Sequence, residues 1–450
     1  MRRLFGTDGA RGVANEFLTC EIAMGIGRAV ASVLSNGKRY RPLVLIGMDT
    51  RISSEMLAAS LRAGLLSVGA DVMDVGVVPT PAVAYLVTKY RADAGIMISA
   101  SHNSFEFNGI KIFSGDGYKL PDELEEQIEA IVLDNDPAPE LATFEKIGRL
   151  KMAPDAVQEY IDHLRKTAFN NIEGLRVAID CANGSASATA EQLFTSMGAE
   201  CHMMACSPDG ININDGCGST HMEKLREYVV ANGLDAGLAF DGDADRFLCI
   251  DEKGNEVDGD MIMAMLSLDM KKRGVLRHNA AVGTIMTNLG FSKFCEENDI
   301  KFIAAKVGDR YVLEQMLLHG YVFGGEQSGH LIFSDYATTG DGQLSALQLL
   351  SFMKREGKPL SELGVMRRYP QALVNIRTTP EGKVAFFTDK EVAKIVAEAT
   401  EFLGDRGRLV VRPSGTEPLL RVMVESETEE ETERVAKETA ERIKERLAQY

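Results

Sequence analysis

The sequence is poor in positive charge. Its 450 residues include 49 Lys and Arg against 66 Asp and Glu, which leaves a formal net charge of −17. Nucleic acids and anionic membranes are bound through basic surfaces, so this balance argues against both as the main partner. No uninterrupted apolar stretch approaches the roughly 20 residues of a membrane-spanning helix, and the opening residues MRRLFGTDG lack the apolar segment of a signal peptide. We therefore expect a soluble, cytoplasmic protein.

Paired cysteines are also missing. The seven cysteines are scattered and odd in number, and they include no Cys-x-x-Cys pattern of the kind found in zinc and redox sites. We interpret them as reduced, small core residues. Hydrophobic residues make up 45% of the chain and charged residues 26%, as in ordinary globular proteins. At about 150 residues per domain, the length predicts three or four domains with sizeable cores.

Short apolar runs alternate with helical patterns through the first two thirds of the chain, which is typical of strands joined by crossover helices. Leu43–Met48 and Ala94–Ser99 are predicted strands, and a helix capped by Ser53 or Ser54 follows the first of them. After Pro370 the pattern changes to that of a smaller α+β unit. We predict three α/β units of similar rhythm and this smaller C-terminal one, with boundaries at residues 1–152, 153–252, 253–365 and 366–450.

One candidate site lies where a predicted strand ends, which is a common place for chemistry in α/β folds. The strand runs into the polar turn Ser99-Ala100-Ser101-His102-Asn103, and Lys111 follows shortly afterwards. A serine flanked by small residues, with a histidine and a lysine nearby, is a candidate nucleophile or phosphate carrier. An ordinary capped turn is an equal alternative for this segment taken alone.

A second polar segment, Asp241-Gly242-Asp243-Ala244-Asp245-Arg246, follows another apolar run. Three carboxylates at alternate positions disfavour one another's ionisation unless a cation compensates them. Mg²⁺ suits this role because it takes carboxylate oxygens together with phosphate oxygens. The spacing is not that of an EF-hand. We predict a magnesium site here, and a solvated acidic turn is the alternative.

Two further segments suit phosphate and sugar. One offers guanidinium forks, two hydroxyls and a glycine that lets the backbone approach a phosphate, and it comprises Arg412, Ser414, Gly415, Thr416 and Arg421. The other, Glu326-Gln327-Ser328-Gly329-His330, offers a carboxylate, an amide and a hydroxyl for sugar hydroxyl groups. A surface turn and a hairpin loop are the respective alternatives. Arg11 adds a cation near the N-terminus. Because these segments lie in different units, a central cleft between domains must collect them.

Five motifs in a fixed order resemble those of a known family. They are FGTDGARG (5–12), ISASHN with NGIK (98–111), DGDADR (241–246), GGEQSGH (324–330) and RPSGTEP (412–418). The set is similar to that of the α-D-phosphohexomutases, and VGDRYV and TTGDGQLSALQ place the resemblance nearest to the bacterial phosphoglucosamine mutase branch. Ser104 and Ala244 replace a proline and a glycine that are common in the family, but every charged position is intact.

The resemblance implies four domains around a central cleft and a role for each motif. Ser101 would carry a phosphoryl group, and one Mg²⁺ per chain would be held by this phosphoserine with Asp241, Asp243 and Asp245. The loop with Glu326, Ser328 and His330 would contact sugar hydroxyl groups. The non-reacting phosphate of the substrate would be bound by Arg412, Ser414, Gly415, Thr416 and Arg421.

The charges of these groups suit phosphoryl transfer. Three aspartates and a phosphoserine of about −1.5 to −2 outweigh one Mg²⁺, and the candidate compensating cations are Arg11, Lys111 and Arg246. Phosphoryl transfer depends mainly on positioning and charge stabilisation, which such a set supplies. The expected proton shuttle is Lys111 or His330, and the sequence leaves both open.

The resemblance implies an isomerase that interconverts glucosamine 6-phosphate and glucosamine 1-phosphate. A 1,6-bisphosphate would be the intermediate, and hexose 1,6-bisphosphate would activate the enzyme. Since the bisphosphate must turn end over end, the C-terminal unit would have to move. The same chemistry on mannose or glucose phosphates is the main alternative, followed by a Mg²⁺-dependent phosphatase and a non-catalytic binding module. A homodimer is a further hypothesis.

Overall fold

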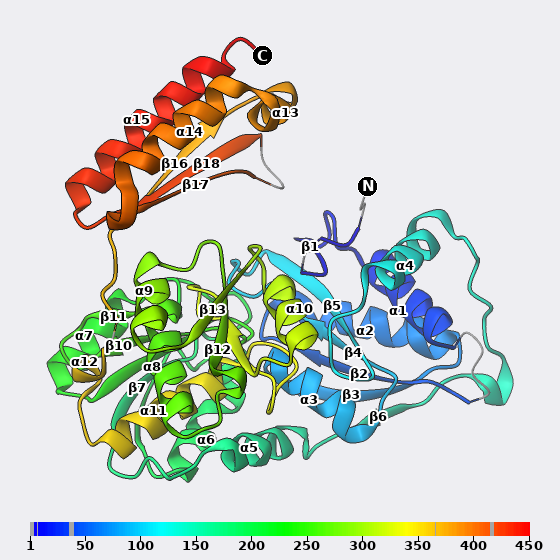
Figure 1. Ribbon diagram of the computed structural model, residues 1–450. Helices are drawn as coiled ribbons and strands as arrows, with labels where there is room; N and C mark the ends of the chain where they lie inside the picture. Colours follow the sequence, from blue (N-terminus) through cyan, green and yellow to red (C-terminus); the bar gives the residue numbers. More distant parts are fainter. Residues whose placement is uncertain (1–3, 7, 36–39, 365, 415–417) are drawn as a thin grey trace.

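The chain folds into four units, each built around its own sheet. A computed structural model describes residues 4–6, 8–35, 40–364, 366–414 and 418–450. Within these residues the strands form sheets of six, five, four and three strands in chain order. Figure 1 shows the fourth unit, in orange and red, standing above the third and joined to it by a single segment. The prediction of three α/β units and a smaller C-terminal α+β unit is confirmed.

The first unit contains the sheet that carries Ser101. Its strand order is β1-β5-β4-β2-β3-β6, and β5 runs antiparallel to its neighbours β1 and β4. The central strands are continuous apolar runs because helices cover both faces of the sheet. The elements are β1 (Ala10–Val13), α1 (Cys20–Ser35), β2 (Leu43–Met48), α2 (Ile52–Ser67), β3 (Asp71–Val77), α3 (Thr80–Tyr90), β4 (Ala94–Ile98), β5 (Phe107–Ser114), α4 (Asp122–Asp134) and β6 (Leu150–Met152).

The start of α2 differs from the prediction. Arg51, and not Ser53 or Ser54, is the N-cap residue, and its side chain makes no capping hydrogen bond. Both serines are buried in the first turn, where Ser54 Oγ donates to Asp49 Oδ1 at 2.8 Å and Ser53 Oγ accepts from Asn108 Nδ2 at 2.9 Å. The capping prediction was wrong because these hydroxyls bind a buried polar cluster of the tertiary structure.

The second and third units contain mixed sheets. The second has the order β11-β10-β9-β7-β8, and the third has the order β13-β12-β14-β15, in which β14 and β15 form an antiparallel hairpin. The elements of the second unit are α5 (Ala156–Thr167), β7 (Arg176–Asp180), α6 (Ala190–Ser196), β8 (Glu200–Met204), α7 (Glu223–Asn232), β9 (Ala236–Phe240), β10 (Phe247–Asp251) and β11 (Glu256–Val257). Those of the third are α8 (Gly259–Lys272), β12 (Ala280–Thr284), α9 (Leu289–Glu297), β13 (Lys301–Ala305), α10 (Asp309–His319), β14 (Phe323–Gly325), β15 (Leu331–Phe333), α11 (Gly342–Glu356) and α12 (Leu360–Leu363).

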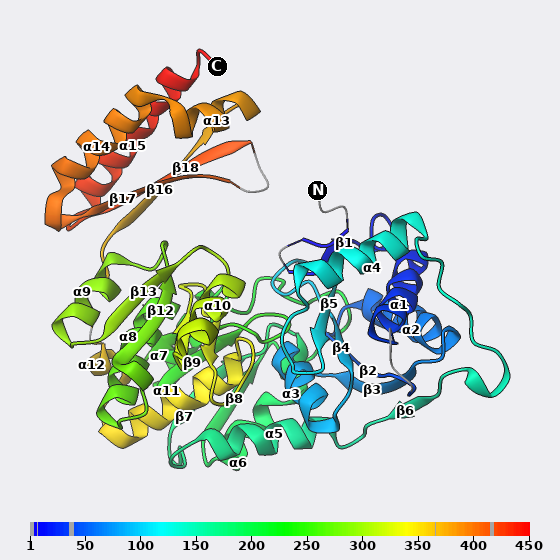
Figure 2. The same ribbon diagram turned by 45° about the vertical axis from the view of Figure 1, so that its right-hand side comes forward.

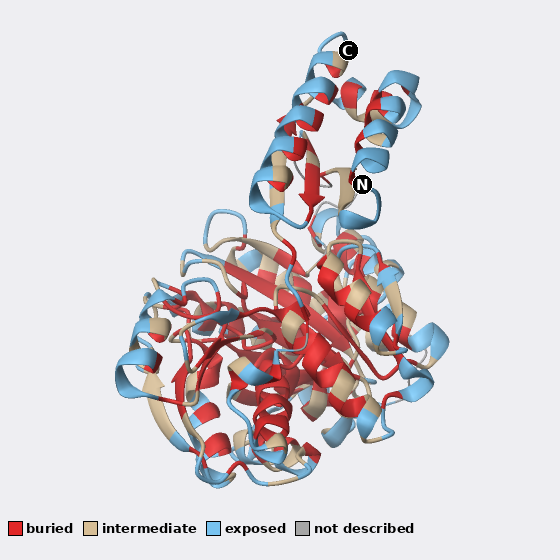
Figure 3. Ribbon diagram, turned by 60° about the vertical axis from the view of Figure 1, so that its left-hand side comes forward, coloured by how far each residue is buried: buried red, intermediate tan, exposed pale blue. Residues whose placement is uncertain are grey.

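One hydrophobic core runs through the first three units. It includes Val83 of the first unit, Val177 of the second, and Phe323 and Leu347 of the third. Figure 3 shows the buried ribbon continuing across the lower part of the molecule, and α11 is buried along nearly its whole length. Shared burial of this kind holds the three units in a fixed arrangement, because separating them would expose apolar surface to water.

The fourth unit has cores of its own. Its sheet has the antiparallel order β16-β18-β17, and residues such as Ile376, Val422 and Ile443 pack together beneath its helices. Figures 1 and 2 show it standing apart from the first unit. The elements are β16 (Gln371–Arg377), α13 (Pro380–Thr388), α14 (Lys390–Leu403), β17 (Arg408–Pro413), β18 (Leu419–Glu425) and α15 (Glu429–Leu447).

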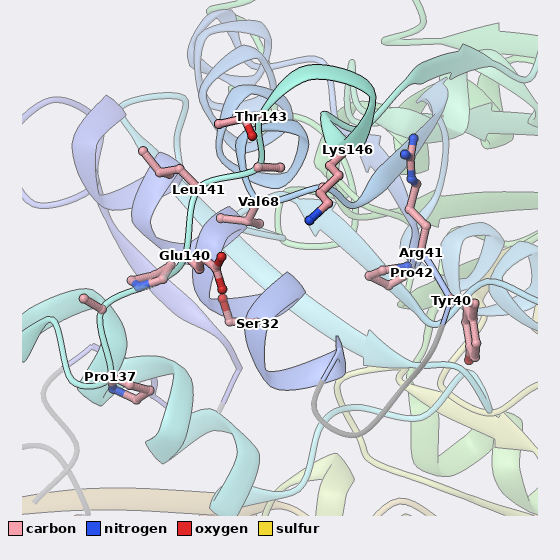
Figure 4. A pocket seen from close by; sticks show the side chains of 14 residues that line it. Ser32, Tyr40, Arg41, Pro42, Val68, Pro137, Glu140, Leu141, Thr143 and Lys146 are labelled. Carbon is pink, nitrogen blue, oxygen red and sulfur yellow. The ribbon is translucent and has the colours of Figure 1, made fainter.

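Three further features concern the chain as a whole. Among the described residues, no helix has the length and apolar character that crossing a bilayer requires. The seven cysteines are free thiols, and four of them are buried; the prediction of core positions is wrong for the other three, Cys20, Cys201 and Cys206, which are half-buried. A cavity of about 520 Å³ opens on the first unit, where Arg41, Glu140 and Lys146 are among its lining residues (Figure 4). Its described lining residues belong to none of the five motifs.

Candidate active site

Ser101 lies at the carboxyl end of β4, in the loop that leads to β5. Its side chain is buried, and its backbone has a φ of 53°, a left-handed conformation that is rare for a residue other than glycine. The Ser101 hydroxyl donates a hydrogen bond to Asp241 Oδ2 at 2.6 Å, and it lies 3.4 Å from His102 Nδ1. The serine of the first unit therefore meets the acidic loop of the second.

The three carboxylates of this acidic loop follow β9 and are buried together. Asp241, Asp243 and Asp245 each place one oxygen within 4.8 Å of the others. Burial, together with the charges of the other two aspartates, raises the pKa of Asp241 well above its ordinary value. Oδ1 of Asp243 and Oδ1 of Asp245 accept no hydrogen bond from the described residues. Buried carboxylate oxygens without donors are the ligands that a hard divalent cation prefers, so the residues fit Mg²⁺.

The acidic loop packs tightly against the serine loop. A β-carbon on Gly242 would lie 2.6 Å from the carbonyl oxygen of Ser101, which leaves no room for a larger residue. Ala244 is buried and has a φ of 53°, a conformation that favours glycine. Ala244, where glycine is common in the resembled family, therefore adopts a strained backbone conformation that costs about 1–2 kcal/mol.

Two of the predicted cations contact the carboxylates directly. Lys111, on β5, places Nζ 2.8 Å from Asp243 Oδ2 and 3.6 Å from Asp245 Oδ2. Burial alone would lower the pKa of Lys111, but the neighbouring carboxylates outweigh it and raise that pKa. Arg246 Nε lies 3.9 Å from Asp245 Oδ1, and the same opposition between burial and the aspartates raises the pKa of Arg246. Both side chains remain cationic.

Arg11 joins this cluster through Asp8. It lies on β1, and its guanidinium is 2.5 Å from Asp8 Oδ2, an oxygen that is also 3.3 Å from Lys111 Nζ. Burial would raise the pKa of Asp8, but Lys111, Lys119 and Arg11 together hold it well below its ordinary value. Arg11 is therefore connected to the carboxylate cluster indirectly, through Asp8 and Lys111.

His330 lies at the end of the β14–β15 hairpin loop and faces the acidic loop. Its Nδ1 is 3.7 Å from Asp245 Oδ2, and its Nε2 is 3.6 Å from Asp309 Oδ2. The backbone N–H of Gly340 donates to Nε2 at 3.1 Å. A nitrogen that accepts a hydrogen bond carries no proton, so in this arrangement the ring proton is on Nδ1, facing Asp245.

Sequence reasoning missed three charged residues that complete the site. Lys119 Nζ lies 2.8 Å from Asp8 Oδ1 and 2.7 Å from Asp309 Oδ2, so it links the first unit to the third. Asp8 and Asp309 stand inside the quoted stretches FGTDGARG and VGDRYV, which was the available signal. Lys119 stands in no motif, and only its tertiary position marks it.

The loop predicted for sugar recognition forms the turn of the β14–β15 hairpin. A hairpin loop was the alternative prediction for this segment. Glu326 Oε1 accepts a hydrogen bond from the backbone N–H of Gly308 at 2.9 Å. Ser328 and Glu326 are half-buried. The hairpin places both side chains in the third unit, in the same loop as His330.

The described residues among those predicted to bind the non-reacting phosphate lie on the fourth unit. Arg412 on β17 lies directly opposite Arg421 on β18. Ser414, two positions after Arg412 in the chain, is buried. Burial and the neighbouring charge of Arg421 lower the pKa of Arg412. Gly415 and Thr416 lie outside the described residues. Figure 2 shows this unit apart from the one that carries Ser101.

Comparison with known proteins identifies the family. Residues 2–138, 158–254 and 258–369 match the alpha/beta/alpha domains I, II and III of the phosphoglucomutase/phosphomannomutase family, and residues 373–442 match its C-terminal domain. The chain belongs to this family, and the resemblance inferred from the motifs is confirmed.

Individual relatives agree with this assignment. The phosphoglucosamine mutase of Acetivibrio thermocellus is 51% identical over 448 residues, which cover 99% of this chain and 100% of that protein. A phosphoglucomutase/phosphomannomutase family protein from Burkholderia thailandensis has the same fold, with a TM-score of 0.83, 22% identity, and coverage of 98% of this chain and 97% of the other. The N-acetylphosphoglucosamine mutase of Aspergillus fumigatus, solved in complex with GlcNAc-6P and magnesium, has a TM-score of 0.69 at 15% identity and covers 99% and 96%.

Proposed function

We propose that the protein is a phosphoglucosamine mutase, an isomerase that interconverts glucosamine 6-phosphate and glucosamine 1-phosphate. One observation carries the proposal: the Ser101 hydroxyl lies 2.6 Å from Asp241 in a buried carboxylate cluster. The full-length identity of 51% to a phosphoglucosamine mutase supports the choice of sugar. Mannose or glucose phosphates are the alternative substrates of the same chemistry.

In the first half-reaction, phospho-Ser101 donates its phosphoryl group to a hexose monophosphate. A sugar hydroxyl oxygen forms the new bond to phosphorus, and the bond from phosphorus to Ser101 Oγ breaks. The sugar proton passes to a base, and Ser101 Oγ takes up a proton as it leaves, which restores its hydroxyl group. In the second half-reaction the other phosphate of the 1,6-bisphosphate returns to Ser101. Each cycle leaves the phosphoserine as it began, so no outside phosphate is consumed. Of the two predicted candidates, His330 is the better base, because Lys111 stays protonated beside Asp243 and Asp245 and cannot accept a further proton.

The residues around Ser101 compensate the charge of the phosphoryl group. Asp241, Asp243 and Asp245 would hold Mg²⁺ together with the phosphoserine, and the bound ion supplies positive charge beside the transferring group. Lys111, beside Asp243, and Arg246, beside Asp245, supply further positive charge. Such preorganised charge is the main source of catalysis in phosphoryl transfer.

The remaining assignments concern substrate placement. Glu326 and Ser328 would bind sugar hydroxyl groups in the third unit. The non-reacting phosphate would be bound on the fourth unit by Arg412, Ser414, Gly415, Thr416 and Arg421. The fourth unit has its own cores, which supports a rigid-body movement toward the other three. We further propose a cytoplasmic location, activation by hexose 1,6-bisphosphate and a homodimer.

Mass spectrometry of the intact protein, with the modified peptide identified, tests the proposal. We expect one phosphoryl group on Ser101 and turnover that is fastest with glucosamine phosphates in a panel of sugar phosphates. Hexose 1,6-bisphosphate should restore activity to a dephosphorylated preparation. Preference for mannose or glucose phosphates would favour the alternative substrates, and release of free phosphate as fast as sugar isomerisation would indicate a phosphatase.

A further inference from the structure

A buried arginine lies directly behind the Ser101 loop. The side chain of Arg51 is fully enclosed, and its Nη2 donates to the carbonyl oxygens of Ser101 and Asn103, at 2.9 Å each. Its Nη1 donates to the carbonyl oxygens of Phe107, at 3.1 Å, and Ser104. One planar guanidinium therefore holds four carbonyl groups of the segment that leads from β4 to β5.

The charge of Arg51 is already neutralised. Its Nε lies 2.8 Å from Asp49 Oδ2, and both side chains are fully enclosed. The same carboxylate accepts hydrogen bonds from the hydroxyls of Ser54 and Ser99, at 2.8 and 2.6 Å. Because the pair is neutral overall, Arg51 contributes little net charge to the phosphoryl site. Its contribution lies in the geometry of its five N–H groups.

A second donor reaches the same oxygens from the second unit. Nδ2 of Asn214 lies 2.9 Å from the carbonyl oxygen of Ser101 and 2.9 Å from that of Asn103. These are the two oxygens that Arg51 Nη2 also binds. Two units of the protein thus converge on one peptide segment, and neither side chain belongs to the carboxylate and cation set described above.

The conformation of Ser101 explains what such a clamp would do. Its left-handed φ of 53° turns the carbonyl toward Arg51 and Asn214, while the hydroxyl meets Asp241. This backbone conformation disfavours a residue with a β-carbon by about 1–2 kcal/mol, so surrounding contacts must hold it. During the proposed reaction the charge on this side chain changes by about two units with each transfer. A loop that relaxed with each change would misplace the reacting oxygen.

We propose that Arg51 and Asn214 are positioning residues that hold the Ser101 backbone in its left-handed conformation through both half-reactions. The inference rests on the proposed function, since it takes Ser101 as the phosphoryl carrier. It assigns a role to two side chains that touch neither substrate nor the phosphoryl group. It also makes the orientation of the serine depend on the docking of the first unit against the second.

Arg51→Lys separates geometry from charge, because it keeps the cation and removes the planar fork. We expect kcat to fall by roughly 10- to 100-fold while KM changes less than about threefold, since the reacting oxygen is misplaced but the sugar site is intact. Single-turnover transfer from Ser101, loaded with glucose 1,6-bisphosphate, should slow by the same factor. Arg62→Lys is the matched control, because Arg62 lies on α2 and pairs with Asp74 instead of the loop.

Asn214→Asp tests the second donor and remains informative if Arg51→Lys does not fold. Aspartate has the size of asparagine and tolerates the φ of 58° at this position, but it turns an acceptor toward two carbonyl oxygens. We again expect a loss in kcat without a comparable change in KM. Asn212→Asp in the same loop is the control, because the Asn212 side chain bonds to Ser207 and Asp209 of its own loop and not to the Ser101 segment.

The double variant decides whether the two residues act on one element. If both hold the same oxygens, the losses of Arg51→Lys and Asn214→Asp combine to less than their product. Either single variant matching its control in kcat and single-turnover rate overturns the proposal, as does a change confined to KM. A wild-type protein that never carries phosphate on Ser101 contradicts the proposed function itself, so the two failures are distinguishable.

Discussion

The site depends on contacts between residues of different units. Ser101 comes from the first unit and Asp241 from the second, yet their side-chain oxygens lie 2.6 Å apart. His330 of the third unit faces the same acidic loop through Asp245. A change at any of these side chains therefore alters the proposed reaction directly, whereas the fold depends on apolar residues elsewhere.

Ser101→Ala should remove turnover and leave the fold intact. The variant loses only one hydroxyl, and alanine has the same β-carbon at the left-handed position. We expect kcat to fall by more than about 1,000-fold, with unchanged circular dichroism and no phosphate detectable by mass spectrometry. Ser104→Ala is the control, because Ser104 is exposed in the same loop. Near-normal turnover of Ser101→Ala would remove the carrier assignment.

Metal removal should affect both turnover and stability. A chelator is expected to abolish turnover and Mg²⁺ to restore it. Since Mg²⁺ would bind only the folded carboxylate cluster, it should raise the unfolding temperature, with about 2.7 kcal/mol of stabilisation at 100 times its Kd. Asp243→Asn should weaken this thermal shift, while Asp215→Asn, at an exposed position, should not. A shift of equal size in both variants would place the ion elsewhere.

At the scale of elements, local patterns predicted most of the structure. The observed β2 (Leu43–Met48), α5 (Ala156–Thr167) and β12 (Ala280–Thr284) coincide with apolar runs and periodic stretches that are visible in the sequence. β14 is only three residues long, Phe323–Gly325, and each of these residues pairs with the edge strand β15. Whether a short segment pairs at the edge of a sheet depends on tertiary contacts. The hydrophobic periodicity of the sequence carries no information about those contacts.

The candidate site was predictable to the extent that its residues lie in motifs. Ser101 and the acidic loop carry local signatures, whereas Lys119 is linked to Asp309 across 190 positions of the chain. Arg51 looked like an ordinary residue before a helix, and its role depends on carbonyl groups 50 or more positions away. Contacts between distant segments leave no spacing pattern in a single sequence, so geometry was needed to find them.

Helix α11 carries a pH-dependent contact between the second and third units. Its N-cap residue Asp341 accepts hydrogen bonds from the backbone N–H of Leu344 and the hydroxyl of Tyr160 on α5, at 2.9 Å each. Burial raises the pKa of Asp341 from 3.8 to about 6. Because the folded state then binds the proton more tightly than the unfolded state, this group contributes stability below about pH 4 that is lost as the pH rises through 6.

Asp341→Asn should remove that pH dependence. Asparagine keeps an oxygen for the cap and has no proton to lose. The stability of the wild type relative to the variant should therefore fall between pH 4 and pH 6, by about 3 kcal/mol at most. Thermal unfolding of both proteins across this range measures the difference. Asp162→Asn, at a more exposed position on α5, is the control, and a constant offset for Asp341→Asn would contradict the prediction.

The whole molecule divides into a fixed body and one separately packed unit. The first three units share one hydrophobic core, whereas the fourth has cores of its own and stands above the third (Figure 1). A buried carboxylate, that of Glu425 in the fourth unit, lies where the fourth unit meets the third. It accepts from the backbone N–H of Leu289 at 2.9 Å and from Arg408 Nε at 2.9 Å, and Asn288 Nδ2 lies 3.3 Å from its other oxygen. The fourth unit is thus attached to the start of α9 by polar contacts.

Glu425→Gln should loosen this attachment without unfolding either part. The variant keeps the shape of the side chain but places an amide group against the N–H donors of Leu289 and Arg408. Breaking a buried ion pair such as that of Glu425 with Arg408 destabilises the folded protein by about 3 kcal/mol. Since the fourth unit holds the proposed phosphate cradle, we expect KM for the sugar phosphate to rise several-fold and proteolysis near residues 364–370 to become faster. Glu427→Gln, exposed two positions along the chain, is the control. Unchanged KM and proteolysis in Glu425→Gln would show that this carboxylate does not set the position of the fourth unit.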